Sequence, residues 1–316
     1  MRSRFFIFLI IFIIITAIMP VSGVSWYYVH VLFLFFVYLV FAQMWNLLAG
    51  YSGLISLGQP AFIGLAGYVL AISMYYGMPL FPSLLLSFAT VTAFAAIISV
   101  PIFRLRGFYF VIGTWMIPEV VRIWFNNWRP VGEVGIGVGG GAGFKLWADL
   151  SPLSLYYMAL VAGIGAILFK RLILSSKLGM GLMAIRDDQD AAETCGINVF
   201  RCKFYTFLIA AFFTGVAGSI FYLFQGHIEP VSAFSIYWTN LMIIAVIVGG
   251  IGTEGGPIVG AAVVVLLEQV LAAYGALSQI ILGVLLVVII ATMPRGIIGT
   301  LAKTQTHKIL LKKLFS

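Results

Sequence analysis

The stretch KLGMGLMAIRDDQDAAETCGIN, residues Lys177–Asn198, lies between two long apolar runs and differs from both of them. The chain of 316 residues is 62% hydrophobic and only 9% charged, yet this one segment holds six charged side chains. Its first part places Leu178, Leu182 and Ile185 on one face of a helix, with Arg186 at its end. This spacing predicts a short amphipathic helix.

Capping residues predict a second short helix directly after the first. Asp190 is the expected N-cap of DAAE, and Glu193 three residues later completes a capping-box pattern. Gly196 ends this helix, and Asn198 caps the next apolar run. We therefore expect two short helices against one membrane face, with an apolar side that a partner's groove can receive. An ordinary solvated loop is the alternative interpretation.

The rest of the chain is too apolar for a soluble protein. Its mean hydropathy is +1.12, which leaves too little polar surface to cover a globule of this length. A bilayer core needs roughly 20 apolar residues per helix, and the long apolar runs do not alternate as barrel strands do. We predict an all-α integral membrane protein of about ten transmembrane helices, over 5–20, 30–49, 58–76, 81–103, 107–125, 153–170, 203–225, 236–252, 257–274 and 276–294.

Basic residues divide unequally between the two sides of this ten-span arrangement. With both termini in the cytoplasm, 15 of the 18 positive charges fall on the cytoplasmic side, among them six from Lys170 to Lys203. The opposite side receives Arg122, Arg129 and Lys145. A cleaved signal peptide ending near Gly23 is an alternative for the first span. The expected organisation is a single transmembrane domain over 1–316, with a cytoplasmic insert at 171–203 and a basic cytoplasmic tail at 295–316.

Small residues indicate how the helices pack. Ala211, Gly215 and Ser219 recur at four-residue spacing, as do Gly67 and Ala71, which allows close approach of neighbouring backbones.

Two glycine and proline elements, at Gly50–Pro60 and Gly249–Pro257, interrupt the helical pattern. Each fits a broken helix beside a transport pathway, and each fits a simple turn between spans equally well.

Four ordered motifs resemble one family. The permease subunits of bacterial and archaeal ABC importers for branched-chain amino acids have counterparts of AGYSGLISLGQPAFIGLAGY at Ala49–Tyr68 and RLRGFYFVIGTWMIPEVVRIWFNN at Arg104–Asn127. They also have counterparts of Gly179–Asn198, where Asp187 stands for the usual glutamate, and of Gly249–Ala261. The chain is more similar to the larger of the two permease paralogues, and urea and short-chain amide permeases are related. The family's TGGxxG run in an outer loop is replaced here by VGEVGIGVGGGAG at Val131–Gly143.

The resemblance implies an importer in the cell membrane of a bacterium or archaeon, in which different subunits capture the solute, form the path and hydrolyse ATP. Its expected partners are a second permease, two cytoplasmic ATPase subunits and an extracytoplasmic binding protein, with no cofactor and no nucleic acid. The insert is expected to couple to the ATPase through Gly179, Ala184, Ile185, Arg186, Asp190, Ala191, Ala192 and Gly196. Candidates for the translocation path or subunit interface are Gln59, Pro60, Glu119 and Arg122.

Other classes of function fit the residues less well. The chain has no GxxxxGK[ST] phosphate loop and no constellation of catalytic residues, so we do not expect an enzyme. His30, His227 and His307 lie too far apart in sequence to indicate a metal site. An ion-coupled secondary transporter should carry more ionisable residues within its spans than Glu119, Arg122 and Glu268.

Glu119 and Arg122 are three residues apart and share a helix face. In a structural role, the two side chains pair with one another, or Arg122 reaches to the outer interface. In a functional role, one or both face the solute or the subunit interface.

Overall fold

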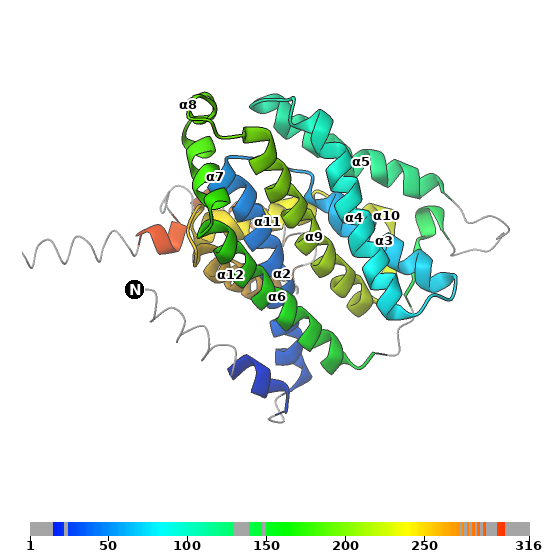
Figure 1. The fold of residues 1–316 in the computed structure, drawn as a ribbon. Helices are drawn as coiled ribbons and strands as arrows, with labels where there is room; N and C mark the ends of the chain where they lie inside the picture. The colour runs from blue at the N-terminus through cyan, green and yellow to red at the C-terminus, as the bar shows by residue number, and fades with distance from the viewer. Residues whose placement is uncertain are drawn as a thin grey trace, which may run out of the picture.

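The computed structural model describes residues 15–21, 25–128, 139–146, 150–271 and 296–300, and scattered residues between 274 and 288. Figure 1 shows the resulting helical bundle. Its elements are η1 (Met19–Val21), α2 (Trp26–Asn46), the π-helical turn η2 (Leu47–Tyr51), α3 (Gln59–Tyr75), α4 (Leu80–Ile102), α5 (Phe108–Asn127), η3 (Gly140–Ala142), β1 (Phe144–Lys145), α6 (Pro152–Leu174), α7 (Lys177–Asp187), α8 (Gln189–Thr194), α9 (Val199–Gln225), β2 (His227–Ile228), α10 (Pro230–Ala233), α11 (Tyr237–Gly249) and α12 (Gly256–Leu271).

Helices occupy eight of the ten predicted spans within the described residues. In the part of the chain that the structure describes, six stretches are long and apolar enough to cross a bilayer, namely α2 with η2, α4, α5, α6, α9 and α10 with α11. The apolar helices α3 and α12 are shorter, with 17 and 16 residues. Most of the predicted first and last spans, of the basic tail and of the outer loop lies outside the described residues, so the number ten and the placement of the termini stay predictions.

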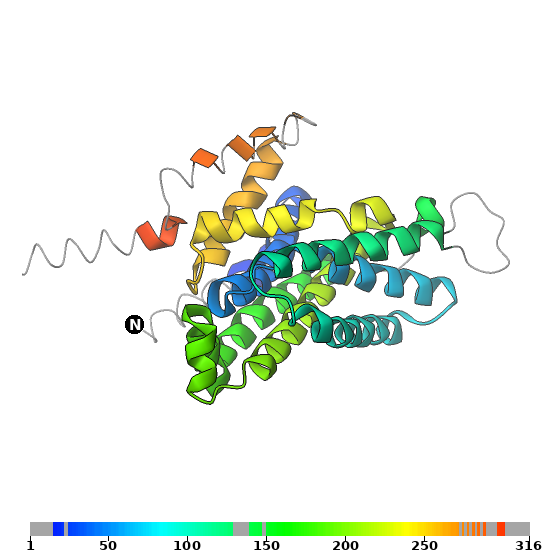
Figure 2. The same cartoon turned by 90° about the horizontal axis from the view of Figure 1, so that it is seen from above.

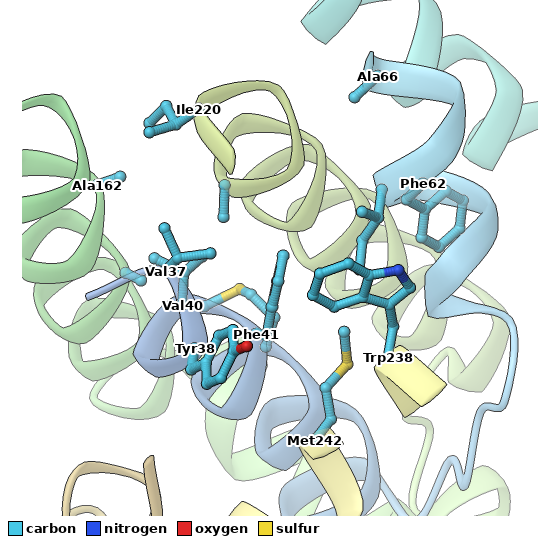
Figure 3. Close-up of a cluster of buried hydrophobic side chains, with 14 of the residues drawn as sticks. Val37, Tyr38, Val40, Phe41, Phe62, Ala66, Ala162, Ile220, Trp238 and Met242 are labelled. Atoms are coloured by element: carbon cyan, nitrogen blue, oxygen red, sulfur yellow. The ribbon is translucent and has the colours of Figure 1, made fainter. Parts of the chain in front are cut away.

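The helix α2 forms the centre of the bundle. Most of its residues are buried, and it packs against α6, α9, α11 and α12. An all-apolar helix could also face lipid, so its central place follows from these contacts and not from its composition. Figure 3 shows this core, where Phe41 of α2 meets Trp238 of α11 edge to face at 5.8 Å between ring centroids. Seen from above in Figure 2, α11 and α12 cross one side of the bundle.

The predicted seam of small residues is confirmed. Ala211 and Ser219 are fully buried on α9, and a Cβ at Gly215 would lie 3.1 Å from Val91 of α4. The Ser219 hydroxyl also shares a hydrogen bond of 3.0 Å with Ser87 of α4. Close approach and one interhelical hydrogen bond thus replace the hydrophobic drive that is missing in lipid.

Among the described residues, one short strand pair adds to the predicted all-α architecture. Phe144 pairs with Ile228 and Lys145 with His227 in an antiparallel ladder. The ladder joins the segment before α6 to the segment after α9. It lies at the opposite end of the bundle from α7 and α8, which follow the other end of α6.

Candidate functional site

The insert folds as the two predicted helices, α7 and α8. The capping pattern predicts Asp190 as the N-cap of α8, and this prediction is wrong. The N-cap is Asp188, whose side chain accepts hydrogen bonds from the backbone N–H groups of Asp190 and Ala191 at 2.9 and 3.0 Å. Gly196 ends the helix at φ +83°, and Asn198 caps α9, both as predicted. Asp190 instead forms an exposed ion pair of 3.3 Å with Arg106, which precedes α5.

The apolar face of the insert packs against the chain itself. It does not face outward toward a partner, which differs from the expectation. Leu182 is fully buried, and Ile185, Ala192 and Val199 form a small cluster of their own, against which Ala184 packs. The helix α7 can pack closely against the end of α6 because Gly179 has no side chain. A Cβ at Gly179 would meet the backbone of Leu174 at 2.5 Å.

A different set of insert residues remains exposed. Met180 has 62% of its surface exposed and Met183 37%, and Ala191 is exposed as well. Any partner of α7 and α8 would therefore meet the methionine side of α7 and the outer side of α8.

Beneath the insert, Arg186 reaches the break that follows α2. Its Nη1 donates to the backbone oxygen of Gly50 at 3.0 Å, while Nε and Nη2 donate to Asp187. Gly50 in turn lies against the α11–α12 connection, since a Cβ at this position would approach the backbone nitrogen of Gly252 to 2.6 Å. The insert and both glycine and proline elements therefore meet at one point.

The amide of Asn46 fastens this meeting point. Its oxygen accepts from the N–H of Gly252 at 2.8 Å, and its nitrogen donates to the backbone oxygen of Thr253 at 3.1 Å. Asn46 is fully buried, so these bonds satisfy a polar group that would otherwise be costly.

Lys170 lies beside the same junction. By sequence it counts among the basic residues of the cytoplasmic face, but only 1% of its surface is exposed. The Nζ donates to Gln43 of α2 and, at 3.2 Å, to the backbone oxygen of Glu254. Neither Asn46 nor Lys170 was a predicted site residue, although a polar side chain at each edge of a long apolar run was a usable signal.

The two glycine and proline elements differ in kind. The element at Gly249–Pro257 is a turn between α11 and α12. The other leaves residues 53–58 without helical bonds, and α3 starts opposite the middle of α9, where Gln59 accepts from Thr214 at 3.2 Å.

Side chains bond the backbone of the inner part of this break, at Ser56 and Leu57. The N–H of Leu57 donates to Thr114 of α5 at 3.1 Å, and its oxygen accepts from Thr239 of α11 at 3.2 Å. The oxygen of Ser56 accepts from the Trp45 indole at 3.0 Å. Protein groups thus replace the helical partners of this irregular backbone, so Gly50–Pro60 is a break within the bundle and not a simple turn between spans. Its place beside a transport pathway stays a prediction.

The candidates for the path fall into two places. Gln59 is fully buried and faces α9, whereas Pro60, Glu119 and Arg122 border a cavity of about 240 Å³ between the first turn of α3, α5 and the α10–α11 segment. The expected pairing of Glu119 with Arg122 is confirmed, because Nε and Nη2 of the guanidinium donate to the two carboxylate oxygens.

The chain is similar to known proteins along most of its length. The family model for "Branched-chain amino acid transport system / permease component" matches residues 27–290. The high-affinity branched-chain amino acid transport system permease protein LivM of Escherichia coli (strain K12) is 27% identical over 288 residues, which cover 83% of this chain and 68% of LivM, and LivM of Salmonella typhimurium matches equally. The permease protein LivH of Escherichia coli is 30% identical over 126 residues, 39% of this chain and 40% of LivH. No solved structure matches the chain significantly.

Proposed function

Because the chain belongs to the family of branched-chain amino acid transport system permease components, we propose that it is the membrane-spanning subunit of an ATP-driven importer of these amino acids. Its homologues are transport subunits and not enzymes. In this proposal a second permease completes the path, two cytoplasmic ATPase subunits supply the energy, and an extracytoplasmic binding protein delivers the solute. The complex resides in the cell membrane of a bacterium or archaeon.

The observation that best supports coupling to an ATPase is the contact of Arg186 with Gly50. A force that a cytoplasmic ATPase applies to α7 and α8 acts directly on the break between α2 and α3, without passing through a flexible loop. The exposed Met180 and Met183 suit a partner groove, since the unbranched thioether side chain adapts to an apolar surface. The site residues of the insert therefore divide into those that hold it on the bundle and those available to a partner.

The test is uptake by the reconstituted complex. The chain would be co-expressed with its candidate permease, ATPase and binding-protein partners and placed in proteoliposomes that contain ATP. We expect labelled leucine, isoleucine or valine to accumulate when the binding protein is present outside, and ADP inside to abolish the uptake. Accumulation of urea or a short-chain amide without any branched-chain amino acid would contradict the proposed solute, and uptake driven by a sodium or proton gradient alone would contradict the importer.

A further inference from the structure

We propose that the cavity between α3, α5 and α10 is a transit site that holds the solute as a zwitterionic α-amino acid with an aliphatic side chain. The inference rests on the proposed function and assigns the solute a place within this chain. With about 240 Å³, the cavity is smaller than the roughly 300 Å³ at which pockets for drug-sized ligands begin, which suits a solute of few atoms.

One end of the cavity is charged. Side-chain exposure is 31% for Arg122 and 47% for Glu119, so a solute can reach both groups. A charged pair on a membrane-spanning helix is costly against lipid, which indicates that this face of α5 adjoins water, solute or another subunit.

The pair matches both charges of an amino acid. A solute carboxylate can take guanidinium N–H groups in the planar, two-bond geometry that arginine favours, while the solute ammonium donates to the Glu119 carboxylate. The site is electrically neutral when empty, because the two side chains pair, and neutral when filled, because the zwitterion carries no net charge. Neither state leaves a buried charge without a partner, so the solute can enter and leave.

The rest of the cavity is lined mostly by apolar side chains, with Ser235 as a polar exception. Trp115 of α5 is 46% exposed and Val231 of α10 is 59% exposed, and the buried rings of Phe234 and Pro118 line it as well. Branched aliphatic groups pack well on such a surface, whereas a second charged group would lose its water there. This division into a charged end and an apolar wall favours leucine, isoleucine and valine over acidic or basic amino acids.

The first test fills the cavity in the reconstituted complex. Val231→Trp places an indole in the apolar part, and we expect leucine uptake at saturating binding protein to fall at least about tenfold, the loss of one good contact. Val161→Trp is the matched control, because Val161 is 67% exposed on α6 and does not line the cavity. Both variants must elute as the assembled complex.

The charged end is tested by Glu119→Gln with Arg122→Gln, which removes both charges and strands neither. A purely structural pair would leave uptake nearly normal, whereas a transit site loses it while assembly and expression remain at the wild-type level. Near-normal uptake by either this double variant or Val231→Trp overturns the proposal.

A binding measurement separates the cavity from the overall function. Photo-leucine would be activated on the intact complex, and the labelled peptides identified by mass spectrometry. We expect labels on peptides that contain Trp115 or Val231, with competition by leucine but much weaker competition by 4-methylpentanoate or 3-methylbutylamine, which each lack one charge. Labels confined to other peptides, or equal competition by the singly charged analogues, would refute the site even where the wild-type complex imports leucine. A wild-type complex that imports no branched-chain amino acid would instead count against the proposed function.

Discussion

The side chain of Asn46 joins two chain breaks that are more than 200 residues apart in sequence, since its amide bonds both Gly252 and Thr253. Asn46→Leu keeps a similar volume but removes both bonds, and it leaves the half-buried backbone groups of Gly252 and Thr253 unpaired. We expect a loss of stability of about 0.5–1.5 kcal/mol for each lost hydrogen bond, seen in denaturant unfolding of the detergent-solubilised protein. Asn127→Leu is the control, because Asn127 is exposed and bonds only within α5; its stability should change by less than about 0.5 kcal/mol. Equal stability of the two variants would show that the hydrogen bonds of Asn46 to Gly252 and Thr253 do not stabilise the fold.

The element α8 presents two neighbouring alanines with opposite environments. Ala191 is exposed, and Ala192 lies in the apolar cluster with Ile185 and Val199. We expect Ala191→Glu to leave folding intact and to weaken ATPase association or uncouple ATP hydrolysis from uptake, because only the outer side of α8 is free for a partner. Ala192→Glu should disrupt the insert itself, since it buries a charge without a partner.

The control for this element lies at the other end of the bundle. Ala142→Glu introduces the same charge at an exposed position of η3, far from α7 and α8. It should leave ATPase coupling unchanged. Full substrate-stimulated ATP turnover in the assembled Ala191→Glu complex would mean that α8 serves only as a connection between α6 and α9.

For the whole molecule, the unequal distribution of positive charge predicts the orientation in the membrane. Lys145 in β1 and Lys177 in α7 lie at opposite ends of the bundle, joined by α6. A reporter fused after Lys145 should therefore read outside, and one fused after Lys177 should read inside. The reverse pair of signals would contradict the orientation and, with it, a cytoplasmic ATPase contact at α7 and α8.

The helices were predictable from the sequence, and the contacts between them largely were not. Apolar run length locates α2, α4 and α9, because the hydrocarbon thickness sets the length of a span. The same pattern cannot say which side of α7 meets its own bundle, and Ile185 and Ala192 turned out to face inward because the cluster with Val199 satisfies them locally. The sequence also could not distinguish a break before α3 from a turn, since glycine and proline mark a turn at the membrane surface and a break inside the bundle in the same way. Which of the two forms depends on distant partners such as Thr114 and Thr239.

The position at which α3 begins has a consequence for leakage. A helix carries roughly half a positive charge at its first turn, and at Gln59 this charge lies deep within the bundle beside the cavity instead of in water at the membrane surface. A sodium ion or a hydronium ion on a path past this point would meet a repulsive potential. A zwitterion of zero net charge meets almost none, and it can point its carboxylate toward the helix. In the proposed importer, the break would thus let an amino acid through without dissipating the ion gradients of the membrane.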